Sequence, residues 1–130
     1  MAAETMPAAL ADFLADRVEP AEFRHADHVR VAFEMLSRHP FLEAASVYAT
    51  RLKRIAARAG RSGAYHETIT VAFLALIAER AASGGYADFD SFAAANPDLF
   101  DPSVLTNWYR RDELSAPLAR QTFVLPGPRL

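Results

Sequence analysis

The sequence predicts an all-α protein, a single-domain compact helical bundle of about five helices. Apolar residues recur every three or four positions in several segments, which is the spacing of one helix face. No segment shows the alternation of apolar and polar residues that is typical of a half-buried strand. The chain has 130 residues, of which 52% are hydrophobic and 23% charged, and this suits one globular domain. We expect the domain to span residues 1–130, with residues 1–15 and 126–130 as candidate mobile ends.

The first two core helices follow from apolar spacing and from proline and glycine stops. Residues 26–38 place apolar side chains at i, i+3, i+4 and i+7, namely Val29, Ala32, Phe33 and Leu36. Pro40 ends this helix and opens the next one. The second helix is expected over residues 41–59, where apolar residues recur until Gly60.

A third helix is predicted over residues 65–82. It is apolar on nearly every side between Ile69 and Ala78, which is typical of a central helix. Because the connections are short, the first three helices should run up, down and up. The first and third would then be parallel, with their N-termini at the same end of the bundle.

The rest of the chain predicts shorter elements. A short helix carries Phe89 and Phe92 and ends at Asn96-Pro97. Asp101-Pro102 is typical of a helix start and predicts a fifth helix. Its expected apolar and aromatic residues are Val104, Leu105, Trp108 and Tyr109. The proline-rich tail should pack onto the bundle through Phe123, Val124 and Leu125, with Arg120 pinned to a carboxylate.

Composition excludes several classes of function. The 14 basic and 16 acidic residues give a net charge of -2, so we expect no nucleic-acid partner. The absence of cysteine excludes disulfides, thiolate zinc sites and cysteine nucleophiles. No apolar run approaches the length of a membrane span, and residues 1–15 do not have the pattern of a secretory signal. We therefore expect a cytoplasmic protein without a membrane partner; a homo-oligomer stays open.

Three histidines lie at predicted helix starts. His25 and His28 open the first helix and His66 opens the third, all on core-facing stripes. Parallel first and third helices would bring these imidazoles together. Further hydrogen-bonding side chains surround His66, namely Tyr65, Glu67, Thr68 and Thr70. The sequence therefore predicts a polar pocket at one end of the bundle, with a small molecule as the expected ligand.

One hypothesis is a metal site. His25, His28 and His66 would bind a divalent transition metal, zinc or iron, and leave a position open for substrate. A further ligand or proton carrier would come from Glu67, Glu22 or Asp27. The helical zinc motif H-E-x-x-H is absent, because Thr70 stands where its second histidine would be.

A second hypothesis is anion binding, because two helix N-termini would direct unpaired N–H groups at one point. Arg24 or Arg30 would assist the histidines. In the structural alternative, the histidines only cap helices and complete hydrogen bonds in the core. The candidate catalytic residues are Glu67 and His66, and the candidate ligand-binding residues are Arg30, Thr70, Tyr65 and Tyr109.

Three segments together resemble a family of small bacterial all-helical proteins whose activity is uncharacterised. They are FRHADHVRVA at residues 23–32, YHETIT at 65–70, and the pair Leu118-Ala119-Arg120 and Phe123-Val124. The resemblance covers about residues 20–125. It implies a compact helical domain and brings no activity, cofactor or substrate with it.

The leading hypothesis is metal-assisted or acid–base chemistry on a small molecule in the His/Glu pocket. The alternative is a non-enzymatic anion-binding or protein-interaction module. The sequence leaves open whether the protein is an enzyme.

Overall fold

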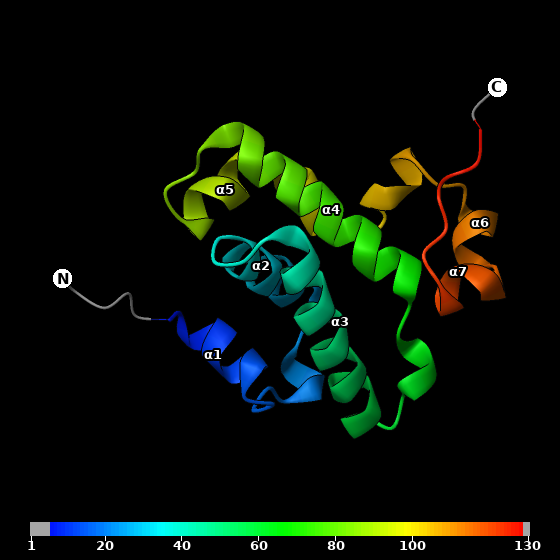
Figure 1. The fold of residues 1–130 in the computed structure, drawn as a ribbon, viewed down its shortest axis with the longest axis horizontal. Helices are drawn as coiled ribbons and strands as arrows, with labels where there is room; N and C mark the ends of the chain where they lie inside the picture. The colour runs from blue at the N-terminus through cyan, green and yellow to red at the C-terminus, as the bar shows by residue number, and fades with distance from the viewer. Residues whose placement is uncertain (1–5, 129–130) are drawn as a thin grey trace.

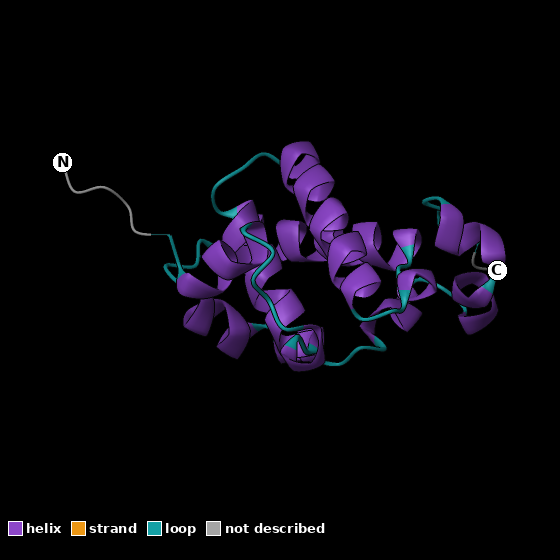
Figure 2. Ribbon diagram, turned by 90° about the horizontal axis from the view of Figure 1, so that it is seen from below, coloured by secondary structure: helices purple, strands orange, loops and turns teal. Residues whose placement is uncertain are grey.

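Helices joined by short loops account for the fold. The computed structural model describes residues 6–128, which form seven α-helices and four short 3-10 helices (Figure 1). Within this range there is no strand (Figure 2). The predicted all-α, single-domain fold is confirmed.

The helices follow the predicted order, with additional short ones at both ends. The α-helices are α1 (Ala8–Leu14), α2 (His25–Leu36), α3 (Phe41–Arg58), α4 (Glu67–Gly84), α5 (Phe89–Ala95), α6 (Arg111–Ser115) and α7 (Pro117–Gln121). The 3-10 helices are η1 (Pro20–Glu22), η2 (Ser62–Ala64), η3 (Pro97–Phe100) and η4 (Val104–Asn107). The observed α2, α3 and α4 agree with the segments expected at 26–38, 41–59 and 65–82 to within the usual uncertainty of helix ends.

Helix α4 is central, as its apolar sequence predicts. It packs against α2, α3 and α7 and crosses the molecule from the side of α7 to α5 in Figure 1. Leu74 and Ile77 are almost fully buried in its middle. The helix ends at Gly84 and is followed by Gly85, whose φ of 61° is in the left-handed region that favours glycine at a helix C-terminus.

Local hydrogen bonds fix the helix starts and the far end of α4. Asp27 accepts a hydrogen bond from the Arg24 N–H at 2.9 Å, which satisfies one free donor before α2. Asp88 caps α5 through the Ser91 N–H at 2.8 Å. Arg80 on α4 donates to both carboxylate oxygens of Asp98, at 3.0 and 2.8 Å. This bidentate pair holds η3 against α4.

The N-terminal part of the chain differs from expectation. Residues 6–15 were among those expected to be mobile, but they contain α1, and Leu10 and Phe13 on it are fully buried. The Phe13 ring lies 5.7 Å from Phe23 and 5.6 Å from Tyr48, measured between centroids. These contacts anchor α1 to the core; residues 1–5 of that expectation lie outside the described residues.

The expected fifth helix was also wrong in length. Only the 3-10 helix η4 forms, because the Asp101 carboxylate accepts hydrogen bonds from both the N–H and the hydroxyl of Ser103 and makes a local turn. Tyr109 is buried as expected, but Trp108 is 41% exposed.

The C-terminal tail packs back onto the bundle only in part. Val124 packs against the core, while Phe123 and Leu125 are 40% and 75% exposed. The buried Thr68 hydroxyl donates to the Thr122 carbonyl at 2.8 Å and accepts from the Val124 N–H at 3.1 Å. Residues 126–128 contain no helix, and 129–130 lie outside the described residues.

Within residues 6–128, no helix by itself has the length and apolar character needed to cross a membrane; α4 and α5 meet these criteria only when taken together, across a bend of 100°.

Candidate functional site

A cavity of about 450 Å³ lies between the start of α2, the second half of α3 and the first turns of α4. Its polar lining residues are His25, His28, Tyr48, Tyr65, His66 and Thr70. Its apolar lining residues are Leu52, Ile55, Ala56, Ala64, Ile69, Phe73 and Pro102. This volume is within the range typical of small-molecule sites. The three histidines predicted to converge therefore line one cavity.

His66 is fixed by two hydrogen bonds. It is the N-cap of α4, and its Nδ1 accepts a hydrogen bond from the Ile69 N–H at 3.1 Å. Nε2 must then carry the proton, which it donates to the Leu114 carbonyl of α6 at 2.7 Å. Both ring nitrogens are occupied, so the side chain joins the start of α4 to α6 as a neutral imidazole.

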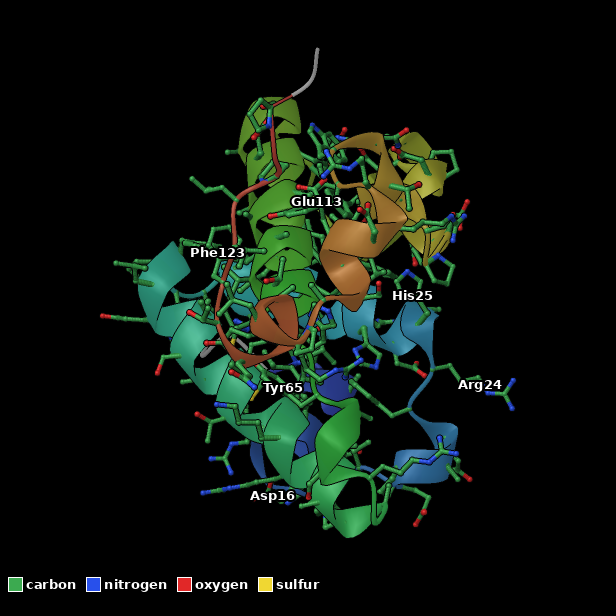
Figure 3. The ribbon with its side chains drawn as sticks, turned by 90° about the vertical axis from the view of Figure 1, so that its right-hand side faces the viewer. Asp16, Arg24, His25, Tyr65, Glu113 and Phe123 are labelled. Carbon is green, nitrogen blue, oxygen red and sulfur yellow. The ribbon has the colours of Figure 1, made fainter. Side chains whose placement is uncertain are left out.

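His25 and His28 stand one turn apart at the start of α2, with ring centroids 6.5 Å apart. The Nε2 of His25 lies 2.8 Å from the Leu99 carbonyl and donates to it, because a carbonyl oxygen only accepts. The His25 ring also packs edge-on against Phe73, at 5.1 Å. Figure 3 shows His25 at the start of α2 and Arg24 pointing away from the molecule.

His28 has a different environment. Its ring packs against Phe23 at 4.4 Å, and within residues 6–128 no group forms a hydrogen bond with its ring nitrogens. Burial lowers the pKa of His28 to about 4, with nearby His25 adding to the effect and Asp27 opposing it. His28 is therefore neutral at pH 7.

Tyr65, just before α4, and Thr70, in the first turn of α4, bring hydroxyl groups to the cavity. The Tyr65 hydroxyl donates to the Glu67 carboxylate at 2.6 Å, and burial together with this hydrogen bond raises the pKa of the Tyr65 phenol. The Thr70 hydroxyl donates to the His66 carbonyl at 2.7 Å. Glu67, a predicted catalytic residue, contacts the cavity only through Tyr65, since it is not among the lining residues.

Two predicted ligand-binding residues are elsewhere. Arg30 lines a separate surface hollow, where it pairs with Glu34 at 3.3 Å and its guanidinium lies 5.2 Å from the centre of the Phe89 ring. Tyr109 is buried, and its hydroxyl donates to the Val124 carbonyl at 2.7 Å. The structure thus brings Tyr65 and Thr70 to the cavity, and it places Arg30 and Tyr109 outside its lining.

Arg120 holds one wall of the cavity in place. Its Nη1 donates to the carbonyls of Gly63, Ala64 and Tyr65 at 2.8, 3.3 and 3.3 Å. The expected carboxylate partner was wrong, since its partners are backbone oxygens. Helix α7 thereby anchors the segment that carries Tyr65 to the cavity.

Sequence reasoning missed the contribution of α3. Tyr48, Leu52 and Ile55 line the cavity from the apolar face of this helix. Their periodicity was visible, but it predicts burial without distinguishing a core contact from a cavity wall. Pro102 was interpreted only as a helix start, and it also lines the cavity.

Metal binding finds little support in this arrangement. Within residues 6–128, no group of three or more His, Cys, Asp or Glu side chains is placed to hold a metal ion. Ligation by His66 would require one of its two hydrogen bonds to break. A metal centre at His25, His28 and His66 stays a prediction.

The family resemblance rests on the sequence motifs alone, because the chain matches no protein-family model, no curated protein and no solved structure.

Proposed function

We propose that this protein binds a small organic molecule in the cavity between α2, α3 and α4, and that His28 provides the principal polar contact. The observation that carries the proposal is a cavity of about 450 Å³ lined by a neutral imidazole that has no hydrogen-bond partner among residues 6–128. The His28 ring is half-buried, and its nitrogens are not among the fully buried unpartnered atoms of the described residues, so they keep some contact with solvent. A bound molecule with a complementary group would replace this solvent at His28, while its apolar part would be buried against the wall.

The composition of the wall favours an organic ligand. Apolar and aromatic residues make up most of it, with a few polar groups converging from α2 and α4. Pockets of this kind bury the body of a small molecule and orient it through one or two hydrogen bonds.

Binding is favoured over acid–base catalysis by the state of the histidines. A general base works best with a pKa near the working pH, and the pKa of His28 lies far below neutrality. His66 would have to give up its helix cap or its bond to Leu114 before it could transfer a proton. Catalysis by His66 and Glu67 stays a second hypothesis, for which the Tyr65–Glu67 hydrogen bond offers a route to the cavity.

The anion alternative is weakened for the same reason. A carboxylate or phosphate would gain from a cationic imidazole, but His28 is neutral at pH 7. Arg24 is exposed and Arg30 lines another hollow, which argues against a contribution of either expected arginine to the cavity.

Two neighbouring alanines on α3 allow a matched test. Ala56 lines the cavity and Ala57 is exposed on the outer side of the helix. Ala56→Trp should fill the cavity, whereas Ala57→Trp should leave it open. Ala64→Trp, on the exposed η2 segment, blocks the cavity from a second side.

The measurement is saturation-transfer NMR of a library of small neutral and charged organic fragments, with circular dichroism to confirm that each variant is folded. We expect a subset of fragments to bind the wild type and Ala57→Trp and to lose binding in Ala56→Trp and Ala64→Trp. The proposal fails if no fragment binds, or if both blocked variants bind the same fragments as the wild type.

A further inference from the structure

Each hydroxyl group of the cavity wall already donates a hydrogen bond to another group of the protein. Tyr48 donates to the His28 carbonyl at 3.3 Å, and Tyr65 donates to Glu67 at 2.6 Å. Thr70 donates to the His66 carbonyl at 2.7 Å. A hydroxyl has one proton and two lone pairs, so each of these oxygens keeps only acceptor capacity.

The imidazoles of the wall also have few N–H donors left for a ligand. Both nitrogens of His66 are bonded, and the proton on the Nε2 of His25 goes to Leu99. The other ring nitrogen of His25, Nδ1, forms no hydrogen bond within residues 6–128. His28 keeps one acceptor and one donor, because neither of its nitrogens forms a hydrogen bond within residues 6–128. Acceptors thus outnumber donors among the remaining hydrogen-bonding positions of the wall.

Formal charge is absent from the lining. None of the thirteen described residues that line the cavity is Asp, Glu, Lys or Arg. Two charged groups contact the wall at Tyr65: Glu67 accepts a hydrogen bond from its hydroxyl, and the Lys53 ammonium lies 5.0 Å from the centre of its ring. An ion entering the cavity would lose hydration without gaining a charged partner in the lining.

We propose that the ligand is an uncharged, largely apolar molecule that donates a hydrogen bond, such as an alcohol or a phenol, and that the acceptor nitrogen of His28 receives it. This inference rests on the proposed function and adds the chemical class of the ligand. It separates donors from molecules that only accept, such as ethers and carboxylates.

Four probes with one carbon skeleton test the inference. They are 3-phenylpropan-1-ol, its methyl ether, 3-phenylpropanoate and 3-phenylpropylammonium, each titrated by NMR chemical-shift mapping at neutral pH. We expect the alcohol to bind about tenfold more tightly than the ether, which is the usual effect of one hydrogen bond. The two ions should bind more weakly than the ether.

The role of His28 is tested by the ratio of the alcohol and ether dissociation constants. His28→Phe keeps an aromatic ring and removes both nitrogens, so this ratio should fall to about one. His39→Phe, at an exposed position beyond the other end of α2, should keep the wild-type ratio. A purely structural effect of the His28 substitution would weaken both probes equally and leave the ratio unchanged.

The outcomes separate the two proposals. If the ether or either ion binds as tightly as the alcohol, the inference about ligand class is overturned while the binding function stands. If the alcohol is preferred but His28→Phe keeps the ratio, the role assigned to His28 is overturned. If none of the four binds, the inference about ligand class is overturned, and the fragment library decides the binding function separately. The wild-type series decides the ligand class even if His28→Phe does not fold.

Discussion

The double role of His66 gives a prediction that can be worked out from its two bonds. In His66→Ala, the α4 start loses the cap on the Ile69 N–H and the Leu114 carbonyl loses its donor. A lost N-cap typically destabilises a protein by about 1 kcal/mol, and a lost hydrogen bond by about 1 kcal/mol. Because the residue is only 8% exposed, solvent replaces these bonds poorly. We expect the free energy of unfolding to fall by about 2 kcal/mol.

His66→Asn separates the two contributions. Asparagine is among the best N-cap residues, but it is too short to reach Leu114, so the loss should be about 1 kcal/mol. For a domain of this size, about 1 kcal/mol corresponds to a shift of about 4 °C in melting temperature. His39→Ala, at an exposed position, is the control and should change stability by less than about 0.5 kcal/mol.

Urea denaturation followed by far-ultraviolet circular dichroism measures these differences, and hydrogen exchange at the Ile69 amide reports on the cap itself. The cap argument is refuted if His66→Asn destabilises the protein as much as His66→Ala. An alanine variant as stable as the wild type would refute both contributions.

Three further predictions concern other parts of the molecule. Because the pKa of His28 is about 4 in the folded protein and near the ordinary 6.5 in the unfolded chain, the unfolded chain takes up the proton first and stability is lost as pH falls from about 6.5 to about 4. Urea titrations at about pH 7.5 and about pH 4 measure how far the free energy of unfolding falls between the two pH values. This decrease should be larger by about 3 kcal/mol in the wild type than in His28→Phe, and equal decreases would contradict a neutral His28 imidazole. Phe13→Ala should cost about 4 kcal/mol in the same assay, because its ring is fully buried, whereas Met6→Ala should be nearly neutral at a 43% exposed position. If Phe13→Ala is neutral too, α1 is not part of the core. Arg120→Ala should speed hydrogen exchange of the amides in residues 63–65 by about tenfold, because it removes the hydrogen bonds that hold this segment. Unchanged exchange rates would show that Arg120 does not hold the segment in place.

The central helices could be predicted because their signals are local. The apolar spacing, Pro40 and the glycine after α4 each act within one or two turns. Helix α1 lacked such a signal, because seven residues do not form a stable helix alone and α1 depends on the contacts of Leu10 and Phe13 with distant residues. The fifth helix was mispredicted because an Asp before Pro starts a helix in some contexts and a tight turn in others.

The candidate site was predictable in outline and not in its hydrogen bonding. Parallel helices were enough to bring His25 and His66 to one cavity. The partners of both rings, however, are the backbone carbonyls of Leu99 and Leu114, which lie 74 and 48 positions away in the chain. Every residue has a carbonyl, so no side-chain pattern indicates which one a histidine will meet. The sequence therefore could not show which hydrogen-bond donors and acceptors of the wall remain available to a ligand.

The contact of Arg120 with residues 63–65 has a consequence for how the cavity can change. Because Arg120 binds only main-chain oxygens there, the anchoring does not depend on which side chains those residues carry. Gly63 has open space where a Cβ would lie, and Ala64 is an exposed lining residue. A substitution at Ala64 would reshape this wall of the cavity, and one at Gly63 would add a side chain next to it, while the loop stays fixed. This segment is thus the natural place to alter ligand selectivity by mutagenesis, or to attach a fluorescent reporter of binding, without redesigning the support beneath it.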